Sequence, residues 1–476
     1  MMTDSYLLVD GEAITPRSRP SIDVTNPATA TTLGQLPVAS IEDIDRAAEA
    51  SVRGFQEWKS RTALERARIL SAAAVVIRQK AAEISSLVTA EQGKTLKEAA
   101  GEVAGAADAI QWLAEEGKRV YGRTVPSRVA GQEQIVSLEP VGPVAAFSPW
   151  NYPVALACRK IGHALAAGCS IVIKPAEECP AGVLALARIF IDQGVPPAAL
   201  QVLFGRPAEI SDRLIRSPHI RKISFTGSVE VGRALGALAG RELKKVTFEL
   251  GGHAPVVVMH DADIARFVEL GVAAKFRNAG QICTSPTRFL VHKQIYEEVV
   301  RRFAERACQL KVGNGMDDAT DMGPLAHARR VEAMESFTTD AVSKGAKVVT
   351  GGTPAAGTGY FWRPTVLADV PAEALVTTNE PFGPLAVFTP FERLGDAIEE
   401  ANGLSYGLAG YGFTGSLRYA REMRQGLRVG IVGINNFTSS TPEMPFAGVR
   451  DSGLGVAQGS EGLRDYLDLK SIYQAD

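Results

Sequence analysis

The feature that most constrains the fold is a repeated alternation of short apolar runs with longer amphipathic stretches. The apolar runs, which are typical of buried strands, are residues 142–147, 170–173, 200–204 and 222–225. Between them lie stretches whose apolar residues recur at helical spacing, at 156–167, 181–193 and 208–216. A second series begins at Ala254–Val258 and continues to about Phe413. Strands that alternate with helices predict parallel sheets covered by helices, so we expect an α/β protein.

The regions outside these two series also carry clear periodicity. Helical spacing of apolar residues predicts helices before the first series, at 41–59, 62–91 and 97–117. Residues 122–140 instead alternate between apolar and polar side chains around a turn at Ala130–Glu133, which predicts a hairpin. The C-terminal segment Tyr466–Tyr473 alternates in the same way.

Length and composition narrow the class of protein. The 476 residues allow two or three domains of about 150 residues each, and the 46% hydrophobic content indicates a large core. A formal net charge of −2 gives no basic excess, so neither nucleic acid nor an anionic membrane is an expected partner. The N-terminus lacks a signal-peptide pattern, and no run of apolar residues is long enough to span a bilayer. Five scattered cysteines without a C-x-x-C pair favour neither disulfides nor a metal site, so we expect a reducing, cytoplasmic setting.

One cysteine and one upstream glutamate have surroundings that suit covalent catalysis. Cys283 is flanked by small and amide residues in the segment Arg277–Thr284, which allows a substrate to approach the thiol closely. Glu249 ends an apolar run and precedes Gly251 and Gly252, as suits a base held on a turn. A thiol that attacks a carbonyl and a carboxylate that activates water together release an acid. The alternative is a buried, unreactive cysteine, which is the commoner state of a free thiol.

Three loops that follow predicted strands offer groups for ligand binding, because ligands bind at the carboxyl ends of strands in such sheets. The first carries Asn151, whose amide suits an oxyanion donor, although the neighbouring proline and tryptophan also suit a merely rigid turn. The second carries Lys174 and Glu177, which suit a ribose or simply form a solvated turn. The third, residues 225–232, has glycines that let a phosphate approach a helix N-terminus, although the G-x-G-x-x-G pattern is absent.

These segments and three later ones occur in an order that resembles one family. They are Pro149-Trp150-Asn151, Lys174-Pro175, Phe225-Thr226-Gly227-Ser228, Glu249-Leu250-Gly251-Gly252, Gly280-Gln281-x-Cys283, Glu380-Pro381-Phe382-Gly383-Pro384 and Pro445-Phe446. With them the chain resembles the NAD(P)-dependent aldehyde dehydrogenase superfamily over nearly its whole length. The resemblance implies an aldehyde dehydrogenase-like α/β fold with two parallel-sheet domains and a small β element. It places a coenzyme-binding domain at 1–121 and 141–248, a catalytic domain at 249–434, and an oligomerisation element at 122–140 and 455–476.

The resemblance also implies roles for individual residues. Cys283 is implied as the nucleophile, Asn151 as the oxyanion donor and Glu249 as the base for thioester hydrolysis. A thiol of ordinary pKa, about 8.5, is only partly ionised at neutral pH, so we expect some activation of Cys283. The expected cofactor is NAD, with NADP possible, because Glu177 would repel a 2′-phosphate that Lys174 partly attracts. The residues implied for cofactor binding are Ser148, Pro149, Trp150, Lys174, Glu177, Gly205, Phe225, Gly227, Ser228, Leu250, Glu380 and Phe382.

Two arginines indicate the substrate. Arg159 and Arg277 stand where the chain resembles succinate-semialdehyde and 2-oxoglutarate-semialdehyde dehydrogenases. Two guanidinium groups near a nucleophile suit the distal carboxylate of a short aldehyde, with Ser440 and Phe446 as further candidates for substrate contact. The alternative is that either arginine is a surface ion-pair partner. Because Ser285 lies two residues after the nucleophile, a disulfide switch at that spacing is excluded.

Several functions remain open at this level. The first is oxidation of succinate semialdehyde or a close homologue, and the second is oxidation of general aliphatic, aromatic or 2-oxoglutarate-semialdehyde substrates. A CoA-acylating relative is disfavoured by Glu249, and a non-catalytic member is disfavoured by the retention of Asn151, Cys283 and Glu380. The family resemblance puts the hairpin and the C-terminal strand in sheets between subunits, so we expect a homodimer or homotetramer.

Overall fold

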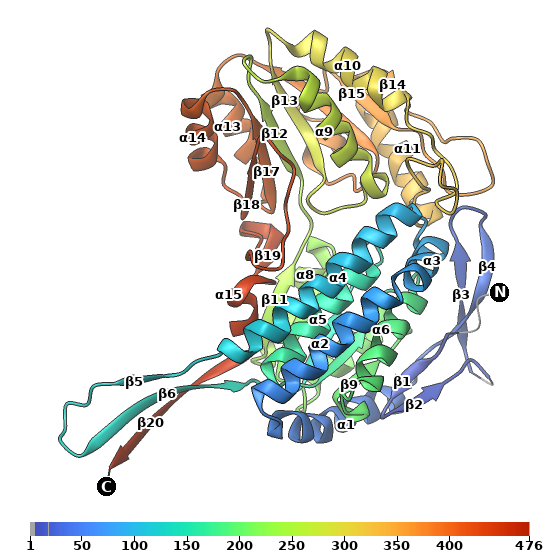
Figure 1. Ribbon diagram of the computed structural model, residues 1–476. Helices are drawn as coiled ribbons and strands as arrows, with labels where there is room; N and C mark the ends of the chain where they lie inside the picture. The colour runs from blue at the N-terminus through green and yellow to red at the C-terminus, as the bar shows by residue number, and fades with distance from the viewer. Residues whose placement is uncertain (1–4, 18, 476) are drawn as a thin grey trace.

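The computed structural model describes residues 5–17 and 19–475, which form two lobes and a projecting arm (Figure 1). Each lobe contains one large sheet with helices packed on it, and the arm is a narrow three-stranded sheet. No helix within the described residues is both long and apolar enough to cross a membrane. The two lobes confirm the prediction of an α/β protein with two largely parallel sheets.

The first lobe is built on an eight-stranded sheet in the order β19-β11-β10-β7-β8-β9-β1-β2. Its parallel strands are β7 (Val144–Phe147), β8 (Ile171–Lys174), β9 (Leu200–Val202), β10 (Lys222–Thr226) and β11 (Lys245–Glu249). Short antiparallel strands complete its edges, namely β1 (Leu7–Val9), β2 (Glu12–Ile14) and β19 (Gly453–Leu454). The chain runs outward from β7 through β8 to β9 and then returns to place β10 on the other side of β7. This reversal creates a switch point between β7 and β10, where α/β sheets open a crevice for ligands.

Helices cover both faces of this first sheet (Figure 1). They are α1 (Ile41–Ser60), α2 (Ala63–Gln79), α3 (Ala81–Gln92), α4 (Leu96–Glu116), α5 (Pro153–Ala167), α6 (Pro180–Asp192), α7 (Pro207–Arg216), α8 (Val229–Arg241) and α15 (Gly459–Arg464), with the short 3-10 turns η1 (Gly117–Arg119) and η2 (Pro197–Ala199). Capping boxes begin α1, α2 and α4 at Ser40, Thr62 and Thr95, so local sequence defines these starts.

The single helix predicted over 62–91 is two helices. Lys80 leaves the helical conformation and separates α2 from α3. Both helices pack on α4 and α6, while α2 also contacts α5 and α3 also contacts the strand β3 (Ser21–Asn26). Strand β3 pairs with β4 (Thr31–Pro37) in a hairpin beside the first lobe. No proline or glycine in the sequence marks the break at Lys80.

The second lobe contains a seven-stranded sheet in the order β14-β15-β16-β13-β12-β17-β18. The strands are β12 (Ala254–Val258), β13 (Pro286–His292), β14 (Lys347–Thr350), β15 (Thr365–Ala368), β16 (Leu385–Phe391), β17 (Ala409–Phe413) and β18 (Ile431–Ile434). All neighbours are parallel except β14, which pairs antiparallel with β15. The helices are α9 (Ile264–Phe276), α10 (Tyr296–Cys308), α11 (Ala328–Ser343), α12 (Leu375–Thr378), α13 (Leu394–Asn402) and α14 (Leu417–Gly426), with the turns η3 (Arg277–Gly280) and η4 (Arg450–Ser452).

The arm consists of β5 (Arg123–Val125), β6 (Gln132–Pro140) and β20 (Leu467–Ala475). Strand β20 pairs antiparallel with β6 from Leu467 opposite Pro140 to Ala475 opposite Gln132, so both ends of the predicted element meet in one sheet. The arm extends away from both lobes (Figure 1). Helix α15 packs on α5 and α4 of the first lobe, so only the last part of 455–476 lies in the arm.

We predict opposite stability changes for two helical glycines. A Cβ on Gly54 in α1 would lie 2.1 Å from the carbonyl carbon of Ala198, whereas a Cβ on Gly105 in α4 meets nothing within 4 Å. Gly54→Ala should therefore lower the free energy of unfolding by about 1–3 kcal/mol through overpacking. Gly105→Ala should raise it by about 0.5–1 kcal/mol because alanine is the better helix former. Urea unfolding of both variants tests this, and a stabilised Gly54→Ala protein would contradict the close packing of α1 on η2.

Candidate active site

A cleft of about 1100 Å³ lies between the two lobes. Its walls bring together all three predicted catalytic residues and all four predicted substrate residues, namely Asn151, Glu249, Cys283, Arg159, Arg277, Ser440 and Phe446. Asn151 and Glu249 come from the first lobe at the carboxyl ends of its strands, Arg159 comes from α5, and Cys283 comes from the loop after η3 in the second lobe. Residues up to 295 positions apart in sequence thus share one cavity where the two lobes meet.

Cys283 sits on a loop with an unusual backbone. Asn278 and Ala279 both have positive φ values, 50° and 52°, which are rare for residues other than glycine. At Gly280, with φ 70°, a Cβ would lie 2.2 Å from the carbonyl oxygen of Gly383, so only glycine fits there. The tight turn places the thiol at the cleft wall.

The environment of the thiol opposes ionisation. Loss of solvation, followed by the charges of Glu249 and Glu380, raises the pKa of Cys283 to about 12, and Arg159 acts weakly in the other direction. The expected activation of Cys283 is therefore not supplied by these neighbouring groups. A thiolate at this position requires a further positive charge or the loss of a neighbouring negative one.

Asn151 is held by a buried network that spans both lobes. Its Nδ2 donates to the backbone carbonyl oxygen of Gln281 at 3.0 Å. The backbone carbonyl oxygen of Asn151 accepts from Lys94 Nζ at 2.8 Å and from Asn278 Nδ2 at 3.0 Å. Lys94 is also paired with Glu102, and both side chains are fully buried. Glu102 in turn accepts from the first backbone N–H groups of α5, at Val154 and Ala155.

Sequence reasoning missed Lys94 and Glu102. Their partners lie 57 and 52 residues away, and neither residue belongs to a segment with a strand-end position. The available signal was weak: a lysine directly after Gly93, whose φ of 95° ends α3, and a glutamate on the otherwise apolar face of α4.

Glu249 ends β11 and is engaged on both carboxylate oxygens. Oε1 accepts from Arg159 Nη1 at 3.0 Å, and Oε2 accepts from Thr226 Oγ1 at 2.7 Å. The Glu249 side chain is 5% exposed and that of Arg159 is 13% exposed, so the ion pair is largely shielded from solvent. The position next to Thr226 follows from sheet register, because β10 and β11 pair these two residues directly.

The two arginines differ in their surroundings. Arg159 is an ion-pair partner, as the alternative interpretation foresaw, but its partner is the predicted base rather than a surface carboxylate. Arg159 also donates to Ser440 Oγ at 3.4 Å and lies 5.0 Å from the ring centre of Phe446. Arg277 is exposed in the cleft, and within the described residues its guanidinium has no hydrogen-bond or ion-pair partner. One guanidinium in the cleft is therefore engaged and the other is open to a ligand.

The predicted cofactor residues gather at the carboxyl edge of the first sheet. Phe147, just before Ser148, pairs with Lys174, and Lys174 is ion-paired with Glu177. Glu177 accepts from the backbone N–H of Gly205 at 3.1 Å, which joins the loops after β8 and β9. Ser228 caps the N-terminus of α8, next to the loop after β10. These loops surround the switch point between β7 and β10, which fits a dinucleotide with its phosphates at the helix N-terminus.

A second group of predicted cofactor residues lies where the lobes meet. The ring of Trp150 contacts Phe382 edge-on at 5.5 Å and His327 at 5.3 Å. Glu380 accepts from the backbone N–H of Gly252 at 3.2 Å, and burial raises its pKa to about 8. Ser148 Oγ and His327 Nδ1 are buried without a hydrogen-bond partner in the described part of the chain, as expected of groups that bind a polar ligand. These residues fit one continuous cofactor site along the edge of the first sheet.

Comparison with known proteins decides the family. The model of the aldehyde dehydrogenase family matches residues 14–472. The chain belongs to the aldehyde dehydrogenase family. It is 48% identical to a putative 4-(hydroxymethyl)benzenesulfonate dehydrogenase, TsaD2, of Comamonas testosteroni, over 98% of this chain and 97% of that one. It is 41% identical to the NADP(+)-dependent succinate-semialdehyde dehydrogenase GabD of Escherichia coli, over 97% of this chain and 96% of that one.

A solved structure agrees with this assignment. The succinate-semialdehyde dehydrogenase from Burkholderia pseudomallei matches with a TM-score of 0.97 at 40% identity, covering 99% of this chain and 98% of that one. The predicted fold and the predicted oxidation of an aldehyde to an acid are thereby confirmed. The predicted use of a nicotinamide dinucleotide agrees with the named relatives.

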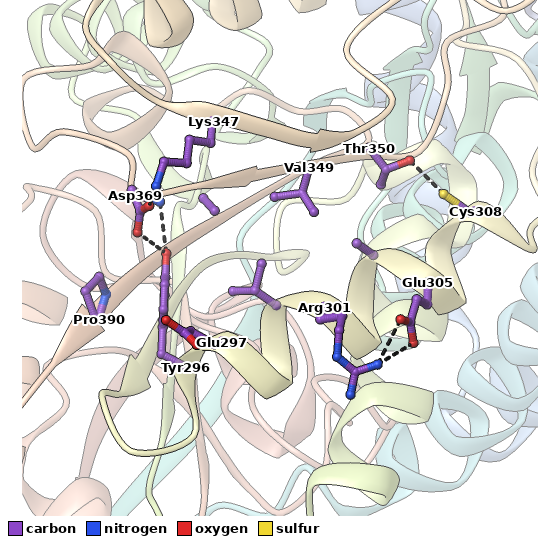
Figure 2. Close-up of a pocket in the computed structure, with 13 residues that line it drawn as sticks. Tyr296, Glu297, Arg301, Glu305, Cys308, Lys347, Val349, Thr350, Asp369 and Pro390 are labelled. Atoms are coloured by element: carbon purple, nitrogen blue, oxygen red, sulfur yellow. Dashed lines mark hydrogen bonds and ion pairs between the residues drawn. The ribbon is translucent and has the colours of Figure 1, made fainter.

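Figure 2 shows a different pocket of this aldehyde dehydrogenase, between α10 and the strands β14 and β15, with a volume of about 570 Å³. Its polar groups satisfy one another. Arg301 pairs with Glu305, the Tyr296 hydroxyl donates to Asp369 at 3.0 Å, and Cys308 contacts Thr350 (Figure 2). None of the predicted site residues lines it. The predicted catalytic and substrate residues line the cleft between the lobes instead.

We predict that Cys283 in the free enzyme is alkylated slowly at neutral pH. Because its pKa is raised to about 12, the thiolate fraction and the rate with iodoacetamide should rise about tenfold per pH unit between pH 7 and 9. Glu249→Gln removes a negative neighbour and should accelerate alkylation roughly tenfold at a given pH. Mass spectrometry of the peptide carrying Cys283 measures the rate, with Glu305→Gln as a remote control. A pH-independent rate, or no effect of Glu249→Gln, would contradict this electrostatic description.

Proposed function

We propose that this aldehyde dehydrogenase oxidises a short aldehyde with a distal carboxylate, succinate semialdehyde or a close homologue, to the acid with NAD or NADP. The observation that carries the proposal is Arg277, whose guanidinium lies in the same cleft as Cys283 and has no partner among the residues that the structure describes. A planar guanidinium suits bidentate binding of a carboxylate. A second guanidinium, that of Arg159, lines the same cleft and adds positive charge beside the substrate.

The chain's own residues suit each step of the reaction. Cys283 adds to the aldehyde carbon, and Asn151 donates a hydrogen bond to the oxygen that becomes negative, which is worth about 3 kcal/mol in the transition state. A nicotinamide dinucleotide held by Lys174, Glu177 and Ser228 would supply the hydride acceptor for this carbon, and Cys283 would then carry a thioester. Glu249 takes a proton from water as the water oxygen attacks the thioester carbon. The carbon–sulfur bond breaks, the acid departs and the Cys283 thiolate is restored.

The cofactor is assigned to the carboxyl edge of the first sheet. Lys174 and Glu177 suit the ribose hydroxyls, Ser228 and the N-terminus of α8 suit the pyrophosphate, and Glu380 and Phe382 suit the nicotinamide end. Glu177 is already paired with Lys174, which weakens its repulsion of a 2′-phosphate. The ion pair therefore fits use of both NAD and NADP better than a strict preference for NAD.

A second candidate substrate is an aromatic aldehyde that carries a sulfonate. A relative at 48% identity is named for 4-(hydroxymethyl)benzenesulfonate, and a sulfonate offers a guanidinium the same fixed negative charge as a carboxylate. The cleft of about 1100 Å³ has room for a benzene ring. Both candidates require a distal anion, so they differ only in the shape of the group between aldehyde and charge.

We predict a clear preference for anionic aldehydes. The native enzyme should turn over succinate semialdehyde, or 4-formylbenzenesulfonate, with a higher kcat/KM than butanal. Arg277→Ala should lower kcat/KM on the anionic substrate roughly ten- to a hundredfold, with little change on butanal. This loss corresponds to about 1.5–3 kcal/mol of transition-state stabilisation.

Steady-state assays with NAD and NADP, with and without CoA, provide the measurement. Arg266→Ala, which removes an exposed arginine from the neighbouring helix α9, is the matched control. Equal kcat/KM values for butanal and both anionic aldehydes would overturn the proposed substrate class. Product formation that depends on CoA would instead indicate acyl transfer.

We also propose that the arm joins subunits. Strand β20 exposes Leu469 and Tyr473, at 75% and 68%, and Tyr121 and Val129 in the segments next to β5 are 74% and 62% exposed. Exposed apolar strands are aggregation-prone unless another chain covers them.

Light scattering at micromolar concentration should therefore give the mass of a dimer or tetramer. Leu469→Asp with Tyr473→Asp should shift the protein toward smaller species, because buried carboxylates oppose the contact. Val342→Asp, on α11 away from the arm, should not. A monomeric native mass would contradict the arm's role.

A further inference from the structure

The ion pair between Arg159 and Glu249 poses a chemical problem for the proposed mechanism. A general base must offer a free oxygen lone pair to the water that it deprotonates. Each oxygen of Glu249 already accepts one hydrogen bond, from Arg159 at 3.0 Å and from Thr226 at 2.7 Å, so the carboxylate is held between these two donors. In the arrangement seen here, water must share each oxygen of Glu249 with a donor that is already present.

Arg159 has the contacts of a side chain that can change partner. It holds Glu249 through Nη1 alone, while Nη2 makes only a long contact of 3.4 Å to Ser440. Its guanidinium packs near the ring of Phe446, a face along which it can move without losing the contact. Within the described residues, Glu249 is the one acidic side chain with which Arg159 forms an ion pair. A second anion in the cleft would compete with Glu249 for the same guanidinium.

Lys160 keeps the released carboxylate from being an isolated buried charge. Its ammonium is buried, donates to Ser224 at 3.1 Å, and interacts electrostatically with Glu249. Loss of the Arg159 contact therefore leaves Glu249 with the Thr226 hydroxyl and a nearby cation, but with one oxygen free. This is the arrangement that a working base needs.

We infer that the distal anion of the substrate triggers the catalytic base: it takes Arg159 and thereby releases Glu249 to activate water. The inference rests on the proposed function and extends it. In this inference the Arg159 guanidinium both binds the anion of the substrate and restrains deacylation. A neutral aldehyde can still acylate Cys283, but its thioester meets a base that is held by Arg159. In deacylation one O–H bond of water breaks toward Glu249, one C–O bond forms, and the carbon–sulfur bond releases the thiolate.

The test separates acylation from deacylation in the native enzyme. Rapid mixing with NAD and butanal should give a burst of reduced cofactor followed by a slow steady phase. Succinate semialdehyde should give a faster steady phase with little or no burst. Absence of a burst with butanal would overturn the inference, because deacylation would then not be restrained.

Variants of Arg159 test whether this side chain restrains deacylation. Arg159→Gln should raise the steady phase with butanal about tenfold, a fraction of the roughly 10²–10⁴-fold that a positioned general base supplies. Arg159→Lys keeps a cation beside Glu249 and should raise the steady phase with butanal less than Arg159→Gln does. Arg418→Gln, which removes an exposed guanidinium on α14, is the control. An unchanged or lower steady phase in Arg159→Gln would overturn the inference.

A detached anion supplies an independent measurement that needs no variant. Acetate added to native enzyme with acetaldehyde should accelerate the steady phase, because the two molecules together replace the two ends of succinate semialdehyde. The same addition should have no effect on Arg159→Gln. If acetate leaves the native steady phase unchanged, the inference fails, whereas equal kcat/KM for anionic and neutral aldehydes is the separate failure of the proposed substrate class.

Discussion

The buried hydrogen-bond network around Asn151 is the interaction on which the catalytic cleft depends. Lys94 and Asn278 both donate to its carbonyl oxygen, and its amide reaches the carbonyl of Gln281 across the lobe boundary. Lys94 and Glu102 form a fully buried ion pair within this network. Removal of either partner would lower the stability of the protein by about 3–5 kcal/mol, because the other would be left as an unpaired buried charge. The network therefore fixes the distance between the oxyanion donor and the cysteine loop, and the cleft geometry follows from it.

The charges around Cys283 form a second layer that this frame holds in place. Glu249 and Glu380 both oppose a thiolate, and burial adds to their effect. Arg159 and Lys160 offset part of the charge of Glu249. This arrangement favours the protonated thiol of Cys283 and keeps Glu249 paired with Arg159. A change of charge in the cleft would alter both side chains.

The parts of this structure that sequence predicts are those set by local pattern. The four strands β7 to β10 and their connecting helices follow from apolar runs that alternate with helical spacing, and Ser40 and Thr62 mark helix starts through capping boxes. The sequence does not predict strands β1 and β2 because each has only three residues. Strand β1 joins the sheet through one long-range pair, Leu8 with Val202, and β2 pairs with β1. Motif order was sufficient to locate Cys283, Glu249 and Asn151 in one cleft. It was not sufficient to show the pairing of Arg159 with Glu249, which depends on how α5 crosses the end of β11.

That pairing changes how selectivity is understood in this cleft. If arginines only attracted the distal anion, selectivity would lie in substrate binding and a neutral aldehyde would differ mainly in KM. A guanidinium that also holds the base shifts part of the discrimination to a step after the aldehyde has reacted, so kcat carries it as well. Arg277, open in the cleft, suits the first task, and Arg159, paired with Glu249, suits the second. These two tasks follow from the positions of the arginines. Arg277 begins the turn that leads to Cys283, and Arg159 lies on α5, which begins just after Asn151.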